Sequence, residues 1–147
     1  MAEAPGSGTE HLEAEECWAL LRRQEVGRLA LAAGDDVEIF PVNHLVDEKR
    51  VLFRTSPGTK LVETARGKSV AFEVDGWSDE AAWSVVLHGR AEELDHPSAL
   101  RHARRTGLES WAPDEKSHYV QIVPERITGR RFARKHDEQP KETLWYF

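Results

Sequence analysis

The chain has 147 residues, which suits one domain with a hydrophobic core, and 39% of them are apolar. Its 26 acidic and 20 basic side chains give a net charge of −6, which argues against a general nucleic-acid binder. A single cysteine, Cys17, excludes an internal disulfide and a cysteine zinc site. There is no long apolar run or signal segment, so we expect a cytoplasmic protein without membrane contact.

Helix and strand patterns follow one another along most of the chain. Residues 1–10 lack periodicity and are expected to be flexible. Apolar residues at i, i+3, i+4 and i+7 predict a helix over 12–24, with Cys17 on its buried face. A second helix is predicted over 59–65, and a third begins with Asp95 as its cap and Pro97 in its first turn. Six strands are predicted over 26–33, 37–44, 51–55, 69–75, 82–94 and 118–127, with Pro124 at an edge or bulge.

The predicted strands are joined by short links, which favour antiparallel pairing. Six antiparallel strands in so short a chain close most economically into a small barrel, because closure removes exposed edges. We therefore predict a mainly β fold with flanking helices. The interior of such a barrel is filled by side chains, so a sizeable ligand must bind outside it, in a groove shared with a second subunit.

The junction between the third strand and the second helix has the composition of a phosphate site. Gly58 lets a ligand approach the main chain, and free N–H groups at the helix start attract an anion. Side chains that add charge or donors are Arg54, Thr55, Ser56, Thr59 and Lys60. An ordinary turn is the alternative interpretation. The basic residues Arg126, Arg130, Arg131, Arg134 and Lys135 form either a solvated face or a contact for phosphate or a partner.

Catalytic motifs are absent from the sequence: it has no Ser/His/Asp order, no recognisable carboxylate pair and no metal-ligand spacing. His44, His88 and His118 can project from strands, where a structural role is the first interpretation and a catalytic or haem-binding role the alternative. A predicted phosphate site without catalytic motifs is typical of a protein whose cofactor carries the chemistry.

Several segments in order carry a resemblance: ECWALL, VGRLAL, FPVNHLVD, VLFRTSPGTKL, VAFEVD, WSVVLHGRAEEL and WAPDEKSHYVQIVPERITGRRF. From Glu16 to Phe132 the chain resembles the actinobacterial branch of the pyridoxamine 5′-phosphate oxidase-like flavoproteins. The resemblance implies a six-stranded antiparallel Greek-key split β-barrel of the FMN-binding type over residues 11–133, followed by a C-terminal tail over 134–147. It also implies a homodimer with FMN at each of two interface sites.

The resemblance carries over to particular positions of this sequence. The family's flavin-contacting strand matches Pro41, Val42, Asn43 and His44, whose main chain would meet the isoalloxazine edge. Its phosphate-binding block matches Arg54, Thr55, Thr59 and Lys60, which are among the residues already selected from composition. Its ring-contacting position on the long strand falls near Trp83 and Ser84.

These matches predict an FMN-dependent oxidoreductase of unknown small-molecule substrate, with hydride passing through the flavin N5 and His44 as the first candidate for an acid or base. The chain ends in Leu144-Trp145-Tyr146-Phe147 without the family's Trp-x-Arg segment, so it is not expected to be a true pyridoxamine-phosphate oxidase. Its tail either docks on its own subunit or crosses the dimer to cover the flavin. The alternatives are a reductase that uses a deazaflavin coenzyme and a non-catalytic flavin- or haem-binding protein.

Overall fold

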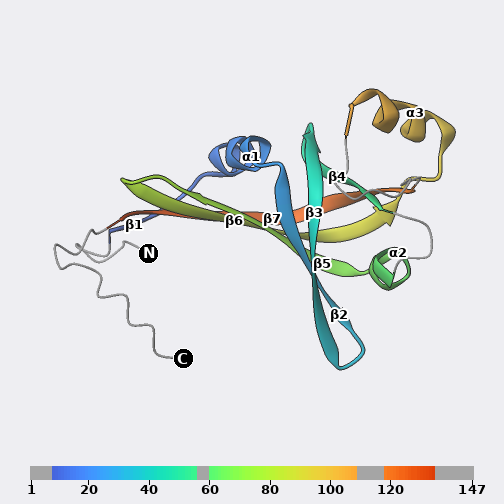
Figure 1. The fold of residues 1–147 in the computed structure, drawn as a ribbon, viewed down its shortest axis with the longest axis horizontal. Coiled ribbons are helices and arrows are strands. Elements are labelled where there is room, and N and C mark those ends of the chain that lie inside the picture. The colour runs from blue at the N-terminus through green and yellow to red at the C-terminus, as the bar shows by residue number, and fades with distance from the viewer. Residues whose placement is uncertain (1–7, 56–59, 109–117, 135–147) are drawn as a thin grey trace, which may run out of the picture.

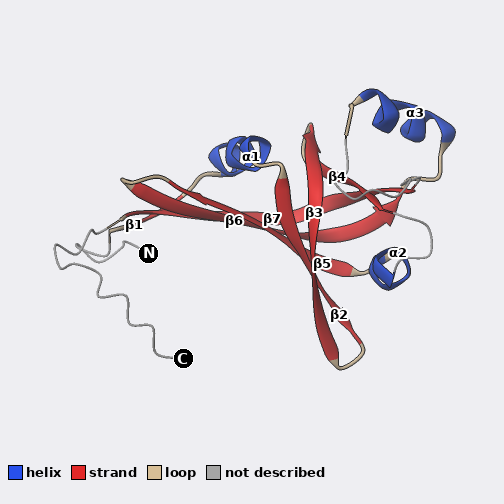
Figure 2. Cartoon of the chain, viewed as in Figure 1, coloured by secondary structure: helices blue, strands red, loops and turns tan. Residues whose placement is uncertain are grey.

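Strands dominate the computed structural model, which describes residues 8–55, 60–108 and 118–134 (Figure 1). The strands are β1 (Thr9–His11), β2 (Val26–Ala33), β3 (Asp36–Asp47), β4 (Arg50–Thr55), β5 (Ser69–Trp77), β6 (Ala81–Glu93) and β7 (His118–Ala133). The helices are α1 (Ala14–Arg23), α2 (Lys60–Ala65) and α3 (Pro97–Arg105), and they lie outside the strands (Figure 2).

The strands form one antiparallel sheet that closes on itself. The order is β1-β7-β4-β3-β2-β5-β6, and an additional β6–β7 pairing closes a ring of six strands to which β1 is appended. Figure 1 shows the β2–β3 hairpin projecting from this ring on one side, and the ends of β6 and β7 on another. The predicted mainly β fold with flanking helices is confirmed, and the ring has the arrangement of a split barrel.

The interior of the ring is filled by apolar side chains from every barrel strand. Among the largest fully buried side chains are Leu29, Val51, Phe53, Phe72, Val74, Leu87 and Ile122. Most of these residues alternate with exposed or half-buried ones that point to the outer face of the sheet. On β4 and β7, Leu52 and Tyr119 point outward and are buried in a second cluster with Ala103 of α3 and Leu108. As predicted, the barrel has a packed core.

Helix α1 covers part of this core. Its buried side chains include Cys17, Trp18 and Leu21, and burial raises the pKa of the Cys17 thiol. A Cβ added to Gly129 of β7 would lie only 2.6 Å from Cys17 Sγ, so the helix packs closely on that strand. The cysteine is therefore a packing residue, as predicted.

Three local features differ from the sequence predictions. Thr9–His11 forms a strand that was not predicted: it pairs with Phe132, Arg131 and Arg130, so β7 extends beyond residue 127 to Ala133. Helix α3 is capped by His96, whose ring accepts from the Ser98 N–H, and not by Asp95. The cap was mispredicted because an imidazole nitrogen can replace the usual carboxylate oxygen as acceptor.

Pro124 was predicted at an edge or a bulge, and it lies beside a bulge. The β6–β7 register shifts between His88 and Gly89, which pair with Arg126 and Pro124, so Glu125 is the extra residue. The division of the chain at residues 10 and 134 stays a prediction, and most of the C-terminal tail, with Trp145 to Phe147, lies outside the described residues.

Candidate functional site

Strand β3 has an open edge where the flavin-contacting residues were predicted. It pairs with β2 from Asp36 to Asn43, but with β4 only from His44 to Asp47. In Figure 1, β3 and β4 share a turn and then diverge. The His44 N–H donates to the Glu25 carbonyl on the β2 side, 2.9 Å away. Because these groups alternate along a strand, the main chain of Ile39 and Pro41 points to the edge facing away from β2.

Pro41 suits this position because it has no N–H to donate and is tolerated in a sheet mainly at edges. Along residues 36–43 no described strand pairs with β3 on the β4 side. The N–H and C=O groups along an unpaired strand edge can hydrogen-bond to the polar atoms at the edge of a planar ligand, as they would to a neighbouring strand.

The His44 side chain lies in the interior. It is 7% exposed, its Nε2 is 2.9 Å from the Leu21 carbonyl, and its ring meets the Phe72 ring edge-on at 5.0 Å. Nε2 is therefore the protonated nitrogen of the neutral ring, and Nδ1 is buried without a hydrogen-bond partner. Burial lowers the pKa of this imidazole. These contacts describe a neutral histidine that ties β3 to α1, and the proposed acid or base role stays a prediction.

The predicted phosphate block is described in part. Arg54 lies on the outer face of β4, where its Nη1 donates to the Leu108 carbonyl at 3.2 Å and its guanidinium lies 5.2 Å from the centre of the Tyr119 ring. Thr55 is 2% exposed and belongs to the opposite face of the strand. Thr59 lies outside the described residues, and Lys60 begins α2.

The two residues predicted on the long strand point in opposite directions. The Trp83 ring packs inward over Gly76, where an added Cβ would come within 2.6 Å of it. Ser84 belongs to the outer face and pairs in register with Asp75 of β5 and Arg130 of β7. Of this pair, only Ser84 is placed to meet a ligand on the outer face. It lies three strands from Pro41 and Asn43, because β2 and β5 intervene.

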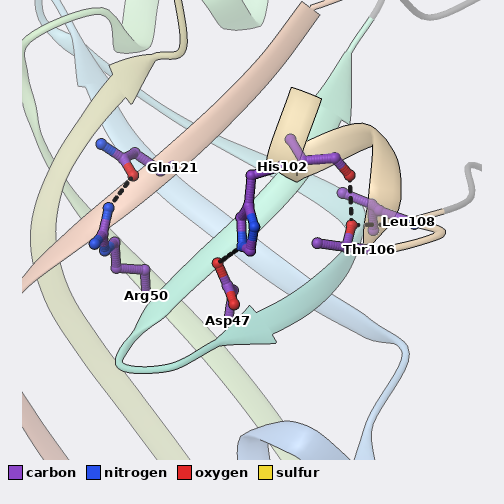
Figure 3. A network of polar contacts seen from close by, with 7 residues as sticks. Asp47, Arg50, His102, Thr106, Leu108 and Gln121 are labelled. Atoms are coloured by element: carbon purple, nitrogen blue, oxygen red, sulfur yellow. Dashed lines mark hydrogen bonds and ion pairs between the residues drawn. The ribbon is translucent and has the colours of Figure 1, made fainter. Parts of the chain in front are cut away.

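Two clusters of polar residues were missed by the sequence analysis. His102 of α3 contacts Asp47 at the β3–β4 turn, with Nε2 and Oδ2 2.7 Å apart, and Arg50 donates to Gln121 at 3.1 Å (Figure 3). They border a cavity of about 300 Å³ between α3 and the sheet. Asp47 and His102 are 55 residues apart, so spacing gave no signal.

Glu93 is the centre of the second cluster. His118 and Arg66 both hydrogen-bond to its carboxylate, and the His118 contact is the main reason why the pKa of Glu93 is lowered. His118 pairs with Thr55 across β4 and β7, so this cluster lies beside the predicted phosphate block and holds the end of α2. It anchors the elements that carry Thr55 and Lys60.

The described residues contain no group of three or more His, Cys, Asp or Glu side chains placed to hold a metal ion. Within the described part of the chain, no helix is long and apolar enough to cross a membrane.

The fold and the open edge of β3 define a split-barrel protein, and comparison with known sequences gives the family. The pyridoxamine 5′-phosphate oxidase family model matches residues 13–131, so this chain belongs to that family. The resemblance found in the sequence is thereby confirmed.

Solved structures and a curated relative agree with this assignment. A Mycobacterium smegmatis FAD binding protein is 39% identical, with 84% of this chain and 98% of that chain covered and a TM-score of 0.75. A Mesorhizobium loti FAD-binding protein is 26% identical, with 84% and 97% covered and a TM-score of 0.71. The uncharacterized Mycobacterium tuberculosis protein Rv0080 is 33% identical over 129 residues, which cover 83% of this chain and 84% of Rv0080.

Proposed function

We propose that this protein is a flavin-dependent oxidoreductase that binds FMN on the outside of its barrel and acts on a small molecule. The observation that carries the proposal is the open edge of β3 at Pro41, which is available for main-chain hydrogen bonds to a planar polar ligand. Family membership and the two relatives described as FAD-binding support a flavin as that ligand.

The residues fit a flavin in their donor chemistry. A phosphate needs fixed cations, and the Arg54 guanidinium is held in one orientation by Tyr119 and the Leu108 carbonyl. Lys60 would add the second cation and Thr59 a hydroxyl. Thr55, with its side chain buried, would meet the phosphate through its main chain. Bound flavin would supply hydride transfer at N5, while the β3 main chain orients the ring and Ser84 offers a hydroxyl on the same outer face.

A homodimer forms part of this proposal. Four large apolar side chains are exposed on the outer face of the sheet: Val37 (74%), Ile39 (66%), Trp77 (73%) and Phe132 (46%). Trp77 and Phe132 are both register partners of Ala82 and so lie on the same face. The neighbouring pair Trp77 and Phe132, at the far end of β5 and β7, favours a protein interface there. A second copy packed on this pair would enclose a ligand between the subunits.

The phosphate site is tested by comparing FMN with riboflavin, which lacks the phosphate. We expect FMN to bind roughly 10- to 100-fold more tightly, because charged hydrogen bonds contribute about 1.5–3 kcal/mol. The ratio should collapse in Arg54→Ala and Lys60→Ala. It should persist in Arg104→Ala, which removes an exposed arginine from α3. Equal affinity of the unchanged protein for FMN and riboflavin would exclude this site.

The same titration separates FMN from its alternatives. FAD contains the FMN portion, so preference for FAD would keep the site and add a contact for its adenylate. Binding of a deazaflavin coenzyme alone would favour the second function predicted from the sequence. Haem would give its own absorption band, which should be lost on changing the histidine that binds the iron: His44, His88 or His118. In the structure, His44 hydrogen-bonds to the Leu21 carbonyl and His118 to the Glu93 carboxylate.

A further inference from the structure

A groove of about 690 Å³ crosses the outer face of the sheet and contains none of the residues assigned to the flavin. Its lining comes from β2, β3, β5, β6 and β7: Ala30, Leu31, Ala32, Val37, Ser69, Val70, Ala71, His88, Gly89, Glu125 and Arg126. The volume lies in the range of small-molecule sites. Five adjacent strands about 4.8 Å apart give a length of roughly 19 Å.

The groove follows a row of cross-strand partners that runs from alanines on β2 and β5 to larger polar residues on β6 and β7. Ala30, Ala71, His88 and Arg126 are successive register partners across β2, β5, β6 and β7, so their side chains lie side by side. At the β3 end of the row stand Ile39, the partner of Ala30, and Val37, the partner of Ala32. Both are among the most exposed large apolar side chains described. This end of the groove is apolar.

The opposite end carries Arg126, His88 and Glu125, of which only Glu125 has an ion-pair partner among the described residues. Arg126 forms no ion pair or hydrogen bond with any described residue, whereas the neighbouring Glu125 is paired with Arg90 at 3.6 Å. His88 Nδ1 is enclosed without a hydrogen-bond partner, so the proton of a neutral ring is better placed on Nε2, which can donate. The bulge at Glu125 breaks the regular ladder here and turns these side chains relative to the rest of β7.

An apolar trough that ends at an unpaired guanidinium and a free imidazole N–H matches one kind of ligand. We propose that this groove binds a small amphipathic carboxylate, with its acidic group on Arg126 and His88 and its apolar body over Ala71 and Ala30 toward Val37. The site is separate from the proposed flavin site and does not depend on it.

Fluorescence titration with 8-anilinonaphthalene-1-sulfonate, an aromatic anion, tests this groove, and dodecanoate serves as the competing carboxylate. We expect one dye per chain, displaced by dodecanoate but not by dodecyltrimethylammonium, which has the same chain and the opposite charge. Arg126→Gln should weaken dye and dodecanoate about 5- to 10-fold, the loss of one exposed charged contact. Arg130→Gln, which removes another exposed arginine of β7 outside the groove, should change neither.

Ala71→Leu fills the floor without touching the barrel core and should abolish dye binding while leaving thermal unfolding and FMN affinity unchanged. The proposal is overturned if Ala71→Leu binds dye normally, if the two arginine variants behave alike, or if both amphiphiles compete equally. It is also overturned if the unchanged protein is a dimer that binds no dye while the Ala71→Leu variant is a monomer. A second copy of the chain would then occupy the groove.

Discussion

The buried imidazole of His44 should make the free energy of unfolding depend on pH in a predictable direction. Burial lowers the pKa of His44 from its ordinary value of 6.5. Below that value the unfolded chain takes up a proton that the folded protein resists. Stability is therefore fully present above about pH 6.5 and falls as the pH drops toward the lower, folded pKa. For one proton the slope is at most about 1.4 kcal/mol per pH unit.

His44→Gln separates this effect from the role of His44 in packing. The glutamine amide can still donate to the Leu21 carbonyl but does not titrate, so the His44 part of the slope should vanish. His44→Ala loses the hydrogen bond and the contact with Phe72 and should cost about 2–4 kcal/mol at neutral pH. Urea unfolding at pH 7.5 and 5.5 measures both effects. An unchanged acid slope in His44→Gln would refute the reasoning.

The same variants test the predicted catalytic role. If His44 is an acid or base, His44→Gln should lower turnover more than FMN affinity, with stability at pH 7.5 largely kept. A variant that loses stability while keeping the turnover of its folded fraction would assign His44 to structure alone.

Three further predictions concern the surrounding framework. Glu93→Gln should lower the free energy of unfolding by about 1–2 kcal/mol at pH 7. Because the pKa of Glu93 is lowered in the folded protein, its carboxylate stabilises the fold only while ionised, so the variant should also lose less stability than the unchanged protein below about pH 4.5. Urea unfolding from pH 7 to below pH 4.5 measures both effects. Gly89→Ala should cost about 1–3 kcal/mol in urea unfolding, since its Cβ would lie 2.1 Å from a carbonyl oxygen of β7, and an unchanged midpoint would contradict this. Tyr119→Leu should weaken FMN roughly 2- to 5-fold by releasing Arg54, and Tyr119→Phe, which keeps the ring, should not; equal loss in both variants would exclude a role for the ring.

Local patterns predicted most of the barrel because alternation and turn residues specify its strands directly. The six strands and the buried Cys17 followed from spacing, and the irregular pairing near Pro124 followed from the missing N–H of proline. Strand β1 was missed because Thr9–His11 has no apolar alternation and depends on an edge of β7 far away in sequence.

The candidate site was less predictable, because side-chain direction depends on partners that are distant in sequence. Alternation along β6 places Trp83 and Ser84 on opposite faces but does not say which of the two faces is open to a ligand. The inward direction of His44 depends on the Leu21 carbonyl of α1. The groove that ends at Arg126 arises only when five strands align, so no single segment of the sequence indicates it.

The central claim is that this split barrel holds a flavin, and the visible absorption spectrum of the purified protein with added FMN tests it most directly. The account predicts a shifted flavin band that saturates at one FMN per chain, with the protein eluting as a dimer. A spectrum equal to that of free FMN at every protein concentration, with FAD behaving in the same way, would contradict it.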